Sequence, residues 1–196
     1  MSIQAIPPDW KQVREIDLQK DPSARQHVSM LCFAIFAAMG MIGIGVFDML
    51  PKQAAAPSGG WQLAAGALGV PLYVLALLGI RALLLRRMNG SWPAFGFRGG
   101  TPWTGFADKC LDRGGVTLVA LAPVLGLAVV FAALALLLPG WFPALWFLLA
   151  LDLGGAAADY LAVGILRGLP KDALCCDAGH ALRFYVREEP DHAGEE

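Results

Sequence analysis

Long apolar segments alternate with short polar ones along most of the chain. The first apolar segment contains one charged residue, Asp48, the second and third contain none, and the fourth contains Asp152 and Asp159. An α-helix needs about 20 residues to cross roughly 30 Å of hydrocarbon, and each segment is long enough to do so. The pattern therefore predicts four membrane-spanning helices at 28–50, 61–80, 116–138 and 141–166.

The connections between the segments predict how the helices are arranged. The first two segments are joined by "PKQAAAPSGG" and the last two by "PG". Because such short connections leave neighbouring helices antiparallel, we expect two helical hairpins. The expected fold class is an all-α integral membrane protein, with a membrane domain at 28–166. An N-terminal arm (1–27) and a C-terminal tail (167–196) flank this domain.

The polar segments carry weaker patterns. In the arm, "DWKQVREIDLQKD" places apolar residues near helical spacing, which fits a short amphipathic helix on the membrane surface or a solvated arm. "GSWPAFGFRGGTPWTGF" at 90–106 is rich in Gly, Pro and aromatic residues, which predicts a short hairpin or a re-entrant stretch. In the tail, "DALCCDAGHALRFYV" resembles two strands around "DAGH", so we expect a small β-hairpin-like element near the C-terminus.

The positive charges predict the orientation. Every Lys and Arg except Lys52 falls in the arm, in the segment between the second and third helices, or in the tail. These three segments lie on one side of a four-helix arrangement, which the positive-inside rule assigns to the cytoplasm. Both termini and the tail hairpin are then cytoplasmic in a multi-pass protein. A net charge of −1 and 57% hydrophobic residues point to the lipid bilayer as a partner and away from nucleic acid.

Small residues recur within the predicted helices, where they let helix backbones approach closely in lipid. Such residues fit either tight packing inside this chain or a face for the helix of another subunit. The candidate helix-packing residues are Gly40, Gly43, Gly66, Gly69, Gly154 and Gly155.

The sequence contains few groups suited to binding a metal or a cofactor. His27, His180 and His192 all lie outside the predicted spans, which argues against histidine ligation of a haem, a bacteriochlorophyll or a zinc ion within the bilayer. Adjacent Cys175 and Cys176 lack the spacing of common zinc sites. We expect the cysteines on the cytoplasmic side to be reduced thiols.

Asp152 and Asp159 are the polar residues of the last span. Their seven-residue spacing predicts that both lie on one helical face. An acid within a membrane span is costly and is often functional. They are candidate buried polar contacts that hold the last helix to its neighbours, or groups on a transport path.

The stretch "AADYLAVGILRGLPKDALCCDAGHALRFYV" resembles the C-terminal part of a bacterial family of membrane zincin peptidases, which are similar to site-2 proteases. In that family the second helix ends in H-E-x-x-H, whose histidines bind zinc and whose glutamate activates water. The equivalent residues here are Arg81, Ala82 and Leu85, and Asp159 matches the position of the third ligand. The resemblance implies a degenerate member, with the family fold and without its catalytic residues, metal or cofactor.

These observations predict a non-catalytic, peptidase-like scaffold in the bacterial inner membrane. It would be an accessory subunit that packs against other membrane-protein subunits and stabilises a larger complex, for which a photosynthetic or respiratory complex is a candidate. Two alternatives stay open. One is an intramembrane metallopeptidase with an atypical site, and the other is a small transporter or proton path that uses Asp152 and Asp159.

Overall fold

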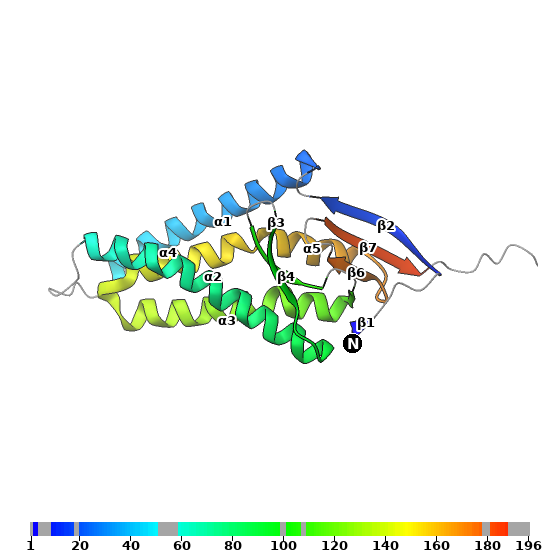
Figure 1. Ribbon diagram of the computed structural model, residues 1–196. Coiled ribbons are helices and arrows are strands. Elements are labelled where there is room, and N and C mark those ends of the chain that lie inside the picture. Colours follow the sequence, from blue (N-terminus) through cyan, green and yellow to red (C-terminus); the bar gives the residue numbers. More distant parts are fainter. Residues whose placement is uncertain are drawn as a thin grey trace, which may run out of the picture.

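The computed structural model describes residues 2–3, 9–17, 20–50, 59–98, 101–106, 109–177 and 181–187 of the 196-residue chain. It is mostly helical, with a small antiparallel sheet at one end of a helical bundle (Figure 1). The long helices are α1 (Pro22–Met49), α2 (Gly59–Asn89), α3 (Arg113–Leu137) and the pair α4 (Phe142–Gly155) and α5 (Ala157–Gly168).

Each predicted span corresponds to one of these helical segments, and the described residues contain four that are long and apolar enough to cross a membrane. α1 begins earlier than expected, at Pro22, because the side chain of Asp21 caps it. The Asp21 carboxylate accepts hydrogen bonds from the backbone N–H groups of Ser23 and Ala24, at 2.9 and 3.2 Å. The Ser23 hydroxyl also donates a hydrogen bond to this carboxylate, at 2.8 Å, and this bond, followed by the backbone bonds, holds the pKa of Asp21 below its ordinary value.

The fourth span is interrupted at Ala156, which the hydropathy pattern did not predict. α4 follows a short 3₁₀ turn (Pro139–Trp141) and ends at Gly155, and α5 begins at Ala157. The break follows the adjacent glycines Gly154 and Gly155, which have low helix propensity. It lies between Asp152 and Asp159, so these acids belong to two consecutive helices.

The β-structure is larger than the expected tail hairpin, because strands from the N-terminal arm, from the segment before α3 and from the tail form a five-stranded sheet. Its strand order is β1–β5–β6–β7–β2, and all neighbours are antiparallel. The strands are β1 (Ser2–Ile3), β2 (Trp10–Asp17), β5 (Cys110–Asp112), β6 (Leu174–Asp177) and β7 (Ala181–Arg187). β6 and β7 confirm the predicted tail hairpin.

Over 10–17 the N-terminal arm is a strand rather than an amphipathic helix, because β2 pairs with β7 from Trp10 opposite Arg187 to Asp17 opposite Ala181, and residues 11–15 remain exposed to solvent. Side chains support this pairing. Arg183 lies 3.5 Å from the Glu15 carboxylate, and Arg187 lies 3.2 Å from that of Asp9. The segment after α2 forms a separate hairpin of β3 (Ala94–Arg98) and β4 (Thr101–Gly105), which confirms the hairpin alternative for 90–106.

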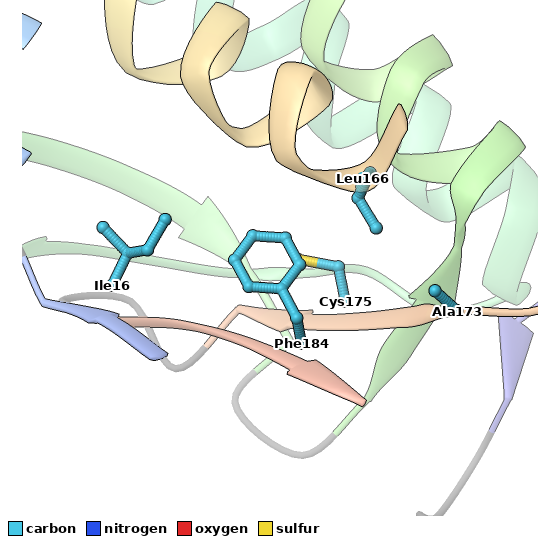
Figure 2. Close-up of a cluster of buried hydrophobic side chains, with 5 residues drawn as sticks. All are labelled: Ile16, Leu166, Ala173, Cys175 and Phe184. Atoms are coloured by element: carbon cyan, nitrogen blue, oxygen red, sulfur yellow. The ribbon is translucent and has the colours of Figure 1, made fainter. Parts of the chain in front are cut away.

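The sheet is joined to the bundle by a compact apolar cluster (Figure 2). Leu166 of α5 meets side chains from β2, β6 and β7 on one face of the sheet, with Phe184 at the centre. The cluster consists of Ile16, Leu166, Ala173, Cys175 and Phe184, all 5% exposed or less. Burial of these side chains fixes the sheet against the end of α5.

The cysteines differ from expectation. Cys110 on β5 lies directly opposite Cys176 on β6, and the two form a disulfide with Cα atoms 4.1 Å apart. The expectation that both are reduced thiols is therefore wrong for this structure. Cys32 and Cys175 are free.

Candidate functional site

An ion pair connects α2 to α5 where the bundle meets the sheet. Arg81 lies in the last part of α2, and Asp159 lies in the first turn of α5. The Nη2 of Arg81 donates a hydrogen bond to the Oδ2 of Asp159, although the residues are 78 positions apart in sequence. Their side chains are 23% and 25% exposed. The structure thus brings together two of the positions that the family resemblance singled out.

The other two positions of the degenerate motif are apolar and buried. Ala82 is 2% exposed and Leu85 is 3% exposed. Zinc sites in proteins use three or more ligands drawn from Cys, His, Asp and Glu. Of the four positions, Asp159 alone carries such a group, and an arginine guanidinium has donors but no lone pair for a metal. The residues present therefore do not fit a zinc ion.

This conclusion extends to the rest of the described chain. No group of three or more His, Cys, Asp or Glu side chains within it is placed to hold a metal ion. Cys175 lies near the ion pair, but burial raises the pKa of its thiol to about 12. A thiol with that pKa stays protonated at neutral pH, so it is poorly suited to act as a nucleophile or a metal ligand.

The ion pair lines a cavity of about 100 Å³ between the bundle and the sheet. Walls come from α2, α3, α5, the sheet and the end of β4. The charged lining residues are Arg81, Lys109, Asp159 and Asp177, and most of the remaining lining is apolar. Two polar atoms of lining residues, the Nε of Arg81 and the Oγ1 of Thr104, are buried without a hydrogen-bond partner among the described residues.

Asp152 has different surroundings from Asp159. It does not line this cavity, and it is fully buried in the bundle, with 0% exposure. Neither of its carboxyl oxygens has a hydrogen-bond partner within the described part of the chain. The hydroxyl of Tyr73 on α2, a residue that is 7% exposed, is an electrostatic neighbour of this carboxyl group. The two acids therefore differ in burial, although Arg81 and Tyr73 are electrostatic neighbours of both.

The candidate packing glycines divide into two groups. A methyl group at Gly154 would lie 2.7 Å from the ring of Phe36 on α1, and one at Gly69 would lie 2.9 Å from Leu148 on α4. Gly43 is also in close contact, with the indole of Trp146, and Gly155 has ordinary clearance from Tyr73. Gly40 and Gly66 have no neighbouring atom within 4 Å of such a methyl group. Close packing inside this chain thus explains Gly43, Gly69 and Gly154, and it does not explain Gly40 and Gly66.

Sequence reasoning did not single out Thr104, Lys109 or Tyr73. Thr104 lies within the turn-rich segment at 90–106 and Lys109 follows it, and nothing in their local pattern relates them to Arg81. Tyr73 lies in an apolar helix, seven residues after Gly66, and its proximity to Asp152 depends on how α2 packs against α4. All three required knowledge of the tertiary structure.

Comparison with known proteins identifies the region that contains this site. No curated protein and no solved structure matches the chain. A family model described as "Putative zincin peptidase" matches residues 79–174, which run from the end of α2 to the start of β6. The matched region includes Arg81, Ala82, Leu85 and Asp159, so over residues 79–174 the chain is similar to this family.

Proposed function

We propose that this protein is a non-catalytic, peptidase-like membrane subunit that packs against and stabilises a larger membrane complex. The observation that carries the proposal is the ion pair of Arg81 with Asp159 at the positions where the family resemblance places two zinc ligands. A guanidinium is charged at all physiological pH values, so it neutralises the Asp159 carboxylate. In this arrangement Asp159 has a fixed partner and is not available as a metal ligand.

The position of the family's catalytic glutamate supports the same proposal. Ala82 occupies it, and its methyl side chain can neither accept a proton nor hold a water molecule. Leu85, one turn further along α2, lines the cavity with apolar atoms. A peptidase would need a base and a Lewis acid or nucleophile here, and the described lining residues supply neither in the places that the family uses.

The packing surfaces support a role within a complex. Gly40 on α1 is exposed, and no atom of the described residues lies within 4 Å of where its Cβ would be. Large apolar side chains on the same helix are also exposed, among them Met41, at 71%, and Ile44, at 67%. A small residue between apolar side chains on a membrane helix permits close approach of another helix. Lipid alone can cover such a face, so the proposal needs a direct test for a partner.

The test is purification of the tagged protein from native membranes, followed by mass spectrometry of co-purifying proteins and metal analysis of the same sample. The proposal expects at least one membrane protein at a fixed ratio to this chain and zinc far below one equivalent. A monomer without a stable companion contradicts the scaffold role. One equivalent of zinc contradicts the non-catalytic role and favours an atypical metallopeptidase.

Asp152 supports a second candidate function, a small proton or ion path. A fully buried carboxyl group without a hydrogen-bond partner is rare, and intramembrane acids commonly serve transport. A flux assay in proteoliposomes that compares the wild-type protein with Asp152→Asn tests this function. A flux that the substitution abolishes, with unchanged assembly, favours transport over the scaffold role.

A further inference from the structure

The cavity beside the ion pair has unmet hydrogen-bonding capacity in an otherwise apolar enclosure. Thr104 is 9% exposed, and its hydroxyl oxygen is buried without a partner among the described residues. The Nε of Arg81 is also buried without a hydrogen-bond partner among the described residues. The Nη2 of the same guanidinium donates its hydrogen bond to Asp159. Both side chains line the cavity. Buried polar groups usually have partners, so two such atoms around one cavity indicate a ligand that supplies them.

The charges of the lining indicate a neutral ligand. Arg81 is paired with Asp159, and the second cation and second carboxylate of the lining are Lys109 and Asp177, so the formal charges balance. A carboxylate placed in this cavity would add an uncompensated charge in a partly buried site, which is costly. The Arg81 Nε donates a hydrogen bond, and the Thr104 hydroxyl donates or accepts one. A carbonyl oxygen with an adjacent amide N–H₂ group matches both.

The size of the cavity and its apolar walls indicate that the ligand carries a small aliphatic group. Leu85, Val116 and Val119 lie around the cavity together with Leu182. A volume of about 100 Å³ is smaller than the ~150 Å³ cavity that takes benzene, so the bound group has at most about six non-hydrogen atoms. This volume excludes a folded or extended peptide segment from lying wholly inside.

We propose that this cavity is a binding site for a small neutral aliphatic amide. The carbonyl oxygen accepts a hydrogen bond from the Nε of Arg81, the amide group pairs with the Thr104 hydroxyl, and the alkyl group contacts the apolar walls. The inference rests on the proposed function in one respect, which is that Arg81 and Asp159 form a lasting ion pair rather than part of a metal site.

The experiment uses the full chain in detergent and isobutyramide as the probe, with binding followed by saturation-transfer NMR in EDTA-containing buffer. Isobutyrate, which has a carboxylate in place of the amide, is the matched probe. Thr104→Val removes the cavity hydroxyl and keeps the side-chain shape. Thr117→Val is the matched control, because the Thr117 hydroxyl bonds to the Arg113 carbonyl oxygen, at 2.8 Å, and does not line the cavity.

We expect saturable binding of isobutyramide, about tenfold weaker binding to Thr104→Val from the loss of one hydrogen bond, and unchanged binding to Thr117→Val. Isobutyrate should bind more weakly than the amide to the wild-type protein. Absence of isobutyramide binding, equal binding to Thr104→Val, or tighter binding of isobutyrate would each overturn the inference. If Thr104→Val does not fold, Ala162→Val, which narrows the same cavity, replaces it and should also weaken binding.

Failure of this inference is distinguishable from failure of the proposed function. Metal content is measured on protein prepared without EDTA, and amide binding is measured with it. Zinc at one equivalent together with saturable amide binding contradicts the proposed function and leaves the ligand site supported. Zinc-free protein that does not bind isobutyramide contradicts the ligand site alone.

Discussion

Arg81 and Asp159 are held about three-quarters buried, where each charge depends on the other. In such surroundings the attraction between two charges is offset by the loss of their hydration, so the pair adds little net stability. Removal of one partner is different, because it leaves the other charge without compensation. The pair therefore constrains how α2 and α5 meet more than it adds to the free energy of unfolding.

We predict that Arg81→Leu and Asp159→Leu each lower the stability by about 2 kcal/mol, less than for a fully buried pair because both side chains retain some exposure. The double variant Arg81→Leu/Asp159→Leu should be more stable than either single variant. Thermal unfolding in detergent, followed by tryptophan fluorescence, measures all three. Additive losses in the double variant would show that the two charges do not interact in solution.

A zinc site should be recoverable at these positions if α2 and α5 keep the geometry of the peptidase family. The variant Arg81→His/Ala82→Glu/Leu85→His recreates H-E-x-x-H on α2, with Asp159 available as the third ligand. We predict about one equivalent of bound zinc after dialysis, measured by metal analysis.

The control for this prediction is the same triple variant with Asp159→Asn, which removes the third ligand and should lower zinc retention at least tenfold. Zinc retention that does not depend on Asp159 would mean that the recreated histidines bind metal without the α5 ligand. In that case the positions of Arg81 and Asp159 would not correspond to the family's metal site.

For single residues, the sequence predicted which positions belong to the candidate site but not which side chains contact one another there. Arg81 and Asp159 were identified through the family resemblance, because their places in the motif depend on sequence alone. Their ion pair, the unpartnered hydroxyl of Thr104 and the proximity of Tyr73 to Asp152 depend on side chains from separate elements. The shared helical face of Asp152 and Asp159 stays a prediction, and the break at Ala156 between them was not predicted.

Helices α1 and α4 pack closely because glycine lets their surfaces approach. A Cβ atom on Gly154 would lie only 2.7 Å from the ring of Phe36. We predict that Gly154→Leu costs about 1–3 kcal/mol of stability, since the helices must separate to fit it. Thermal unfolding of the purified variant measures this loss.

Gly40→Leu is the matched control on α1, and its effect on stability should stay within about 0.5 kcal/mol, because no atom of the described residues lies within 4 Å of a Cβ at that position. The same variant should reduce recovery of a partner from native membranes if Gly40 belongs to an interface. A large loss of stability in Gly40→Leu would show that the position is packed within the chain.

The elements differ in how well the sequence predicted them, for a physical reason. The existence of the helical spans follows from local hydropathy, but their ends do not: α1 begins at Pro22 rather than at 28, α2 continues to Asn89 rather than ending at 80, and the last span breaks at Ala156. The hairpin of β6 and β7 was also predicted, because its strands are separated by a short turn. β2 was not, because its partner is β7 at the other end of the chain, and apolar residues at Trp10, Val13 and Ile16 fit helical spacing equally well in isolation.

At the scale of the whole molecule, the N-terminal strand β2 and the C-terminal strand β7 lie at one end of the bundle, where the sheet, the ion pair and the cavity are found together (Figure 1). The positive charges are concentrated at the same end. The positive-inside rule assigns that end to the cytoplasm, whereas the disulfide between Cys110 and Cys176 is more typical of an oxidising compartment. An experiment on the orientation of the chain in the membrane decides which of the two compartments contains the sheet.

We predict that alkaline phosphatase, which requires its own disulfides and is active only outside the cytoplasm, is inactive when fused after Glu196 and active when fused after Gly59. Phosphatase activity in cells expressing each fusion, normalised to the amount of fusion protein, measures the orientation. Gly59 begins α2 at the opposite end of the bundle from the sheet, so the two fusions should give opposite results. Activity of the Glu196 fusion would instead place the sheet and the cavity outside the cytoplasm. There the disulfide would persist, and the distribution of Lys and Arg would not determine the orientation of this chain.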